Sequence, residues 1–164
     1  MASSSAPPSP LIQVLRRREG QARKLGDRPK ETSQVKVPSD TERMRSFIET
    51  QDLDRSKRFY AALGFEQVLD GEVAIFNVAS GGLILARHTG GHAPNSNLMM
   101  QVMVDDLDAW WAHIESLDLA KEFGVPPPRR PALQPWGLRI AYVVDPSGVL
   151  WHFAQRRPGT IQDR

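Results

Sequence analysis

The chain of 164 residues contains no cysteine, and aromatic residues make up only 7% of it. The absence of cysteine excludes disulfide bonds, thiolate metal sites and a cysteine nucleophile. No apolar run approaches the ~18 residues of a membrane-spanning helix. The apolar segment LIQVL (11–15) is too short for the core of a signal peptide, and the basic cluster follows it instead of preceding it. We therefore expect a cytoplasmic protein without a membrane partner.

A positive net charge occurs only at the beginning of the chain. Residues 1–43 contain nine Lys and Arg and five Asp and Glu, whereas residues 44–164 contain twelve and fourteen. The second segment is therefore mildly acidic, which argues against the basic face that a nucleic-acid-binding domain presents. We expect no nucleic acid partner.

Residues 1–43 are rich in Ser, Pro and charged residues and contain no aromatic residue. Such a segment cannot bury enough apolar surface to offset the conformational entropy that folding removes. We predict a disordered N-terminal tail over 1–43 and a C-terminal tail over 156–164. A transit peptide is disfavoured by the acidic residues, and translation starting at Met44 is an open alternative.

The remaining sequence contains an internal duplication. Residues 50–63 are TQDLDRSKRFYAAL and residues 104–117 are VDDLDAWWAHIESL, so that Asp52 aligns with Asp106. The repeat occurs only twice, which indicates a domain of two modules rather than a repeat array.

Each copy begins with a short apolar strand pattern, in residues 44–50 and 98–104. An aspartate follows where a helix would begin, and its side chain can accept hydrogen bonds from free backbone N–H groups. A helical pattern comes next, and Trp110 and Trp111 in the second copy are interpreted as core residues. At most one of the two tryptophans can lie at the centre of the buried face.

Strand signals follow the first helix at 64–70, 72–78 and 82–88. In the second half, two strands at 137–144 and 148–154 are joined by an Asp-Pro-Ser-Gly turn. Residues 117–125 are expected to end the helix and enter a strand, and the proline-rich residues 126–131 to form a connector. The predicted fold is α+β, with a strand–helix–three-strand module over about 44–88 and again over 98–155, in one domain at 44–155.

Three segments, DLDRSKRFYAALGF (52–65), VDDLDAWW (104–111) and DPSGVLWHF (145–153), resemble the glyoxalase/bleomycin-resistance/dioxygenase superfamily, also called vicinal oxygen chelate proteins. The resemblance implies two tandem βαβββ modules forming a curved, barrel-like mixed sheet around a pocket. The run QPWGLR (134–139) is most similar to the bleomycin-resistance-like members. That similarity implies ligand binding without a metal, and a homodimer.

The resemblance also places the metal ligands of the family's enzymes at Arg45, Ala86, Met99 and His152. Arginine offers no lone pair, alanine has no donor atom, and a methionine thioether suits only soft metals. Only His152 is a competent ligand, and zinc sites need three or four. We therefore expect no metal, no cofactor and no catalytic residue. His88 and His92 lie four residues apart in a glycine-rich segment, and a surface metal site there is a less favoured alternative.

Strand alternation places several of these side chains on one face, toward the expected pocket. The residues predicted to bind a small-molecule ligand are Arg45, Phe47, Glu49, Met99, Gln101, Trp136 and His152. An ion pair between Arg45 and Glu49 is a further possibility on this face. For His152 the alternatives are a histidine satisfied within the strand interior or a catalytic base. Trp136 either stacks on a ligand or packs on the sheet as a lid.

The favoured function is a metal-independent small-molecule-binding protein that sequesters an antibiotic or another toxic compound. The first alternative is a metal-dependent lyase or oxygenase of the glyoxalase or dioxygenase type. A metal-free enzyme that uses His152 is a weaker one. The poor set of metal-donor atoms favours a binding protein over an enzyme.

Overall fold

The computed structural model describes residues 43–90, 95 and 97–156, which belong to one compact unit. Of the predicted tails at 1–43 and 156–164, only Arg43 and Arg156 are among the described residues. His92, one half of the alternative surface metal pair, lies outside the described residues. No helix in the described ranges has the length and apolar character needed to cross a membrane.

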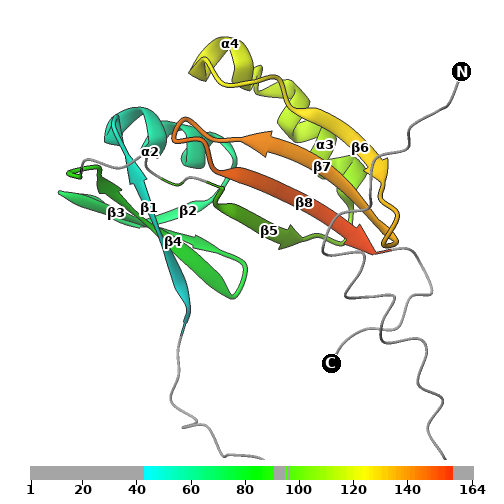
Figure 1. Ribbon diagram of the computed structural model, residues 1–164, viewed down its shortest axis with the longest axis horizontal. Coiled ribbons are helices and arrows are strands. Elements are labelled where there is room, and N and C mark those ends of the chain that lie inside the picture. The colour runs from blue at the N-terminus through cyan, green and yellow to red at the C-terminus, as the bar shows by residue number, and fades with distance from the viewer. Residues whose placement is uncertain (1–42, 91–94, 96, 157–164) are drawn as a thin grey trace, which may run out of the picture. The chain divides into compact units, whose positions relative to one another are not determined.

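The first module forms a four-stranded mixed sheet with one helix (Figure 1). Its elements are β1 (Arg45–Thr50), α2 (Leu53–Ala62), β2 (Glu66–Leu69), β3 (Val73–Val78) and β4 (Gly81–Arg87). The strand order is β1-β4-β3-β2. β1 runs parallel to β4, and the other neighbours are antiparallel.

The second module repeats this topology. Its elements are β5 (Met99–Met103), α3 (Leu107–Ser116), α4 (Leu119–Phe123), β6 (Arg129–Leu133), β7 (Leu138–Val144) and β8 (Leu150–Arg156). The strand order is β5-β8-β7-β6, and β5 is parallel to β8. The predicted α+β fold with two tandem modules is confirmed, and each module keeps its own four-stranded sheet.

Both helices begin where the duplicated aspartates were predicted to cap them. The carboxylate of Asp52 accepts a hydrogen bond from the Arg55 backbone N–H at 2.9 Å. Asp106 accepts the equivalent bond from Ala109, also at 2.9 Å. Because each aspartate satisfies a donor that the first helical turn leaves free, the same local sequence starts a helix twice.

The prediction for residues 117–131 was wrong in two respects, although the helix α3 does end as expected, with Leu117 as its C-cap residue. Residues 119–123 form the short helix α4, which ends at Gly124 in a left-handed conformation with φ 57°. The third strand of the module is β6, in the segment expected to be a connector. β6 lies at the edge of its sheet and its pairing with β7 is irregular between Arg129 and Ala132. An edge position tolerates Pro131, which a central strand would not.

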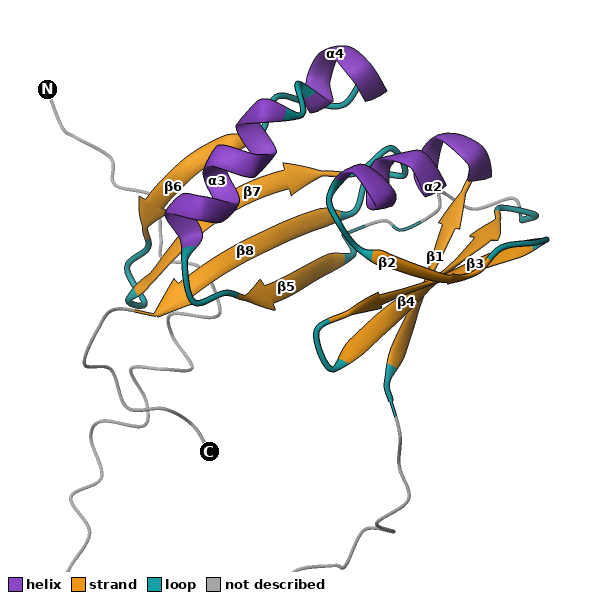
Figure 2. Cartoon of the chain, turned by 180° about the vertical axis from the view of Figure 1, so that it is seen from behind, coloured by secondary structure: helices purple, strands orange, loops and turns teal. Residues whose placement is uncertain are grey.

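The helices cover one face of the sheets, and the hydrophobic core lies between them (Figure 2). The largest buried side chains include Trp151, Tyr60, Phe59 and Phe76. Trp110 and Trp111 pack against this core but are only partly buried, so neither occupies the centre of the buried face.

A buried hydrogen-bond network joins the two modules. The Tyr60 hydroxyl of α2 donates to the Asp145 carboxylate at 2.5 Å, and the Trp151 indole N–H donates to the Tyr60 oxygen at 3.2 Å. Asp145 also accepts from the backbone N–H groups of Ser147 and Val149, both at 2.8 Å. One carboxylate therefore fixes the turn before β8 and ties that turn to the first module.

Burial dominates the titration of this network. It raises the pKa of Asp145, although the hydrogen bonds from Tyr60 and from the turn act in the opposite direction. Burial also raises the pKa of Tyr60, and the nearby charge of Asp145 adds to that effect. The phenol therefore stays protonated at neutral pH and can act as the donor.

We predict that Tyr60→Phe lowers the free energy of unfolding by about 1–3 kcal/mol, because it leaves the buried Asp145 carboxylate without one of its donors. Urea denaturation of the full chain measures the loss. Tyr142→Phe is the matched control, since the Tyr142 hydroxyl forms no hydrogen bond with another described residue. Equal destabilisation by the two substitutions would contradict the assigned role of Tyr60.

Candidate functional site

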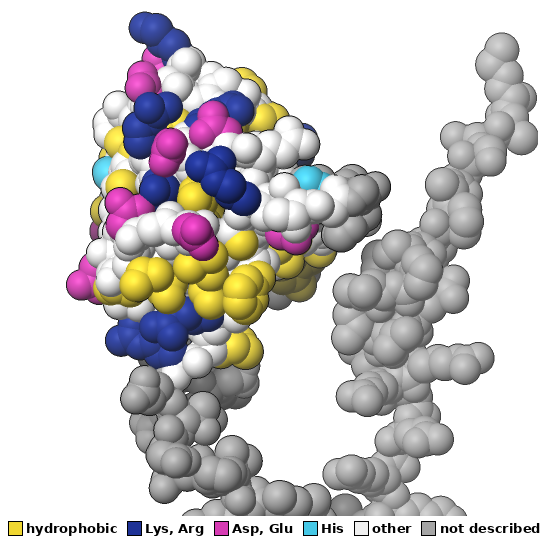
Figure 3. All heavy atoms as spheres, turned by 90° about the vertical axis from the view of Figure 1, so that its left-hand side faces the viewer, with side chains coloured by type: hydrophobic (Ala, Val, Ile, Leu, Met, Phe, Trp, Pro, Cys, Tyr) yellow, Lys and Arg dark blue, Asp and Glu magenta, His cyan; other side chains and the backbone are white. Residues whose placement is uncertain are grey.

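Each sheet has a second face that no described helix covers (Figure 2); we call these two surfaces the open faces. Successive residues of β1 point alternately to the core and to the open face of the first sheet. Ile48 and Thr50 are buried toward the helix, while Arg45 and Phe47 are exposed. Phe47 has 67% of its surface exposed. Figure 3 shows exposed apolar side chains gathered in a band on the side of the first module.

Glu49 also lies in β1, but its carboxylate does not pair with Arg45. It accepts a hydrogen bond from the ring Nδ1 of His88 at 2.9 Å. Arg45 forms no ion pair with any described residue. The possible Arg45–Glu49 pair is therefore replaced by a Glu49–His88 pair at the end of β4.

The open face of the second sheet is formed by alternate residues of β5, β8 and β7. Met99 and Gln101 are exposed on β5, and His152 is paired with Gln101 across the two strands. Tyr142 of β7 is paired with His152 from the other side. Trp151 and Phe153, the neighbours of His152 in sequence, are buried in the core, so His152 faces away from the helix.

Trp136 lies in the turn between β6 and β7, apart from the residues at the centre of either open face. Its side chain is 63% exposed, which does not agree with a lid packed on the sheet. The structure thus places the seven predicted residues in three locations. Arg45, Phe47 and Glu49 lie on the first sheet, Met99, Gln101 and His152 lie on the second, and Trp136 lies in a turn; their role in ligand binding stays a prediction.

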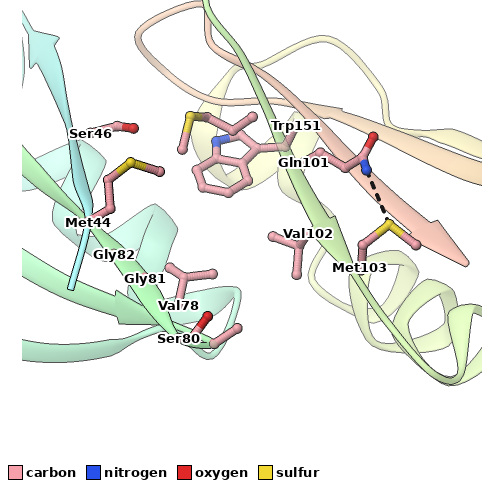
Figure 4. A pocket seen from close by; sticks show the side chains of 12 residues that line it. Met44, Ser46, Val78, Ser80, Gly81, Gly82, Gln101, Val102, Met103 and Trp151 are labelled. Carbon is pink, nitrogen blue, oxygen red and sulfur yellow. Dashed lines mark hydrogen bonds between the residues drawn. The ribbon is translucent and has the colours of Figure 1, made fainter. Parts of the chain in front are cut away.

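A cleft of about 330 Å³ separates the edges of the two sheets (Figure 4). On one side lie Met44, Ser46 and the turn between β3 and β4; on the other lie β5 and Trp151. The Gln101 amide donates to the Met103 thioether at 3.1 Å beside this cleft. Of the seven predicted residues, Gln101 alone lines it.

The strand register corrects one step of the sequence alignment. Arg45 is paired with Gly82 in the first sheet, and its counterpart Met99 is paired with Leu150 in the second. His152 therefore corresponds to Ile84, and Ala86 corresponds to Ala154. The sequence comparison had treated Ala86 and His152 as equivalent because each follows a glycine, Gly82 or Gly148, by four residues. Gly148 lies in a turn with φ 88°, however, whereas Gly82 lies inside β4.

After this correction, the residues at the expected metal-ligand positions are still poor ligands for a metal ion. The corrected set contains a guanidinium, an isoleucine, a thioether and one imidazole. Only His152 offers a ligand that divalent cations commonly accept. The described residues contain no group of three or more His, Asp or Glu side chains placed to hold a metal ion. The donor set does not fit a resident metal.

His152 is held in an apolar environment. Its ring contacts the Tyr142 ring edge-to-face, with centroids 4.7 Å apart. Its Nε2 atom is buried without a hydrogen-bond partner among the described residues. Burial lowers the pKa of His152, because the charged imidazolium would lose hydration there. The imidazole is therefore neutral at neutral pH, with Nε2 able to donate to a ligand or to accept from one, depending on the tautomer.

Sequence reasoning missed two polar residues of this open face, Tyr142 and Arg129. Strand alternation in 137–144 was sufficient to place Tyr142 beside His152. Arg129 could not be placed because its segment was expected to be a connector. It is paired with Tyr142 across β6 and β7.

A family model described as the glyoxalase/bleomycin resistance protein/dioxygenase superfamily matches residues 45–153. Among curated protein sequences, none matches the chain. Several solved structures are similar. A bleomycin-binding protein complexed with bleomycin has 28% sequence identity and a TM-score of 0.58, and the match covers 70% of this chain and 97% of that one.

A bleomycin resistance determinant encoded on a transposon has 26% identity and a TM-score of 0.57, over 71% of this chain and 99% of that one. A lactoylglutathione lyase from Agrobacterium tumefaciens has 21% identity and a TM-score of 0.54, over 77% and 100% of the two chains. At this lower identity, the similarity to the lyase concerns the fold alone.

The lowered pKa of His152 predicts a pH dependence of stability. A histidine whose pKa is depressed on folding contributes stability that is complete above its unfolded value and is lost as the pH falls through the folded value. The melting temperature of the wild type should therefore fall more than that of His152→Gln between neutral pH and about pH 5. His113→Gln, on the exposed surface of α3, should behave like the wild type; identical pH profiles for all three proteins would refute the prediction.

Proposed function

Because the chain belongs to the glyoxalase/bleomycin resistance protein/dioxygenase superfamily, we propose that it is a metal-independent small-molecule-binding protein. The superfamily and the bleomycin-resistance-like solved structures support small-molecule binding. The finer proposal is that the protein sequesters an antibiotic or another toxic compound in the cytoplasm. One similar protein was solved with bleomycin bound, which supports this proposal by analogy.

The observation on which the proposal mainly rests is the donor set at the metal positions. Arg45, Ile84 and Met99 replace the hard ligands that a lyase or oxygenase of this fold would need. His152 then contributes a polar group to a face that also carries many apolar side chains. Such a surface suits binding and orientation of an organic ligand rather than activation of water or oxygen.

The proposed ligand site lies on the open faces, which carry most of the residues predicted from the sequence. Methionines on β5 can repack around ligands of different shape. Phe47 on β1 provides an apolar aromatic surface, and Gln101 and His152 provide hydrogen bonds. Trp136, exposed in its turn, can stack on a planar or cationic group.

We further propose that a second copy of the chain covers the open faces in a homodimer. Phe47, Met99 and Met103 are 67%, 63% and 41% exposed in the single chain, although all three are large apolar residues. Large apolar side chains exposed in this way are found at interaction sites. A ligand held between two copies would be shielded from water.

Two measurements on the full chain test the binding proposal. After incubation with Mn²⁺, Ni²⁺, Zn²⁺ or Fe²⁺ and dialysis, we expect far less than one bound metal per chain. In a thermal-shift screen of glycopeptide antibiotics and aromatic acids, a true ligand at a hundredfold excess over its Kd should add about 2.7 kcal/mol of stability. Stoichiometric metal retained by the wild type and lost in His152→Ala would favour the metal-dependent alternative.

The homodimer is tested by light scattering coupled to size-exclusion chromatography. Phe47→Asp places a charge on the open face of the first sheet and should shift the protein to a monomer, because desolvating an unpaired carboxylate at an interface is unfavourable. Ala112→Asp, on the exposed side of α3, is the matched control and should not change the mass. A monomeric wild type at all concentrations would disprove this part of the proposal.

A further inference from the structure

A row of polar side chains crosses the open face of the second sheet from one edge to the other. The register pairs Gln101 with His152, His152 with Tyr142, and Tyr142 with Arg129. Directly paired residues of neighbouring strands project to the same face. With strands about 4.8 Å apart, the polar row extends over roughly 14 Å.

The orientation of Arg129 is supported by its neighbour Arg130. Arg130 reaches the other face, where its guanidinium binds Glu115 of α3 at 2.6 Å and lies over the Trp111 ring. Successive side chains of a strand point to opposite faces, so Arg129 belongs to the open face. Arg129 is exposed and forms no hydrogen bond or ion pair with another described residue.

The fold itself does not require this polar row. The equivalent row of the first sheet is entirely apolar, and consists of Phe47, Ile84, Ile75 and Leu69. On the second sheet, apolar residues flank the polar row on both sides: Met99, Leu150 and Val144 on one side, and Met103, Ala154 and Ile140 on the other. The polar row is therefore a local feature of one face and not a consequence of the strand topology.

The polar groups of the row form few hydrogen bonds with other described residues. Among the described residues, Nε2 of His152 is buried without a hydrogen-bond partner and the Tyr142 hydroxyl forms no hydrogen bond. The Gln101 amide donates to the Met103 thioether, which is a weak acceptor. Buried polar atoms normally have partners, so an orphan such as Nε2 indicates that something else supplies one.

The charge of this face has a definite sign. Arg129 provides an exposed positive charge on it, and among the described strands β5 to β8 no carboxylate projects to the open face. The face is therefore cationic although residues 44–164 carry more acidic than basic side chains. Local charge, and not the net charge, determines the electrostatic preference for a bound ligand.

Given the proposed function as a ligand-binding protein, we propose that the ligand is an elongated aromatic anion lying along the polar row. Its carboxylate or equivalent acidic group binds the Arg129 guanidinium, and its ring system lies across Tyr142 and His152. Gln101 at the opposite end provides hydrogen bonds to a distal polar group. The first sheet, with its apolar row, has no comparable set of contacts.

Three probes of the same shape and different charge test the sign of the ligand: biphenyl-4-carboxylate, biphenyl-4-carboxamide and protonated 4-phenylbenzylamine. Calorimetric titration of the full-length protein at neutral pH should show the carboxylate binding at least about tenfold more tightly than the other two. Arg129→Ala should reduce carboxylate binding to the level of the amide. Arg130→Ala, which removes the adjacent cation from the opposite face, should leave it unchanged.

The unfolding midpoint of Arg129→Ala is measured as a control. A midpoint close to that of the wild type shows that the variant is folded, so that weaker binding reflects the loss of the guanidinium. Tightest binding of the amine, equal binding of all three probes, no binding of the carboxylate, or full carboxylate binding by Arg129→Ala would each overturn the anion assignment. A different result would contradict the proposed function itself: no compound in the thermal-shift screen stabilises the protein. A compound from that screen that is cationic and independent of Arg129 would overturn only the present inference.

Discussion

The hydrogen bond between Tyr60 and Asp145 is the constraint on which the arrangement of this domain depends. Among the described residues no strand pairing joins the two sheets, so side-chain contacts join the modules, and the bond between Tyr60 and Asp145 is a buried one. The same carboxylate holds the turn from which β8 starts, through the backbone N–H groups of Ser147 and Val149. The link between modules and the placement of His152 on β8 are therefore parts of one network.

The duplicated modules share a framework but present different chemistry on their open faces. Each has an aspartate-capped helix, a parallel pair of strands and a buried core-facing row. On the first sheet, the central row of the open face is apolar, whereas on the second it is polar and cationic. Because the strand topology is the same, the difference comes from the side chains of the two open faces.

Local signals made the framework predictable, while long-range contacts and proline made parts of it unpredictable. Asp52 and Asp106 revealed both helix starts, and alternation placed His152 on the open face. The strand β6 was missed because prolines at 126–131 obscure an edge strand, and with it Arg129 was missed as well. The contact between Tyr60 and Asp145 joins residues 85 positions apart, and the local sequence around neither residue predicts it.

The proline in β6 also has a consequence for assembly. Pro131 lacks a backbone N–H, and the strand pairing beside it is already irregular. An additional strand approaching this outer edge would meet a broken ladder of donors, which disfavours uncontrolled sheet extension and fibre formation. This edge is therefore a poor template for an extended peptide, and recognition is left to the side chains of the sheet faces.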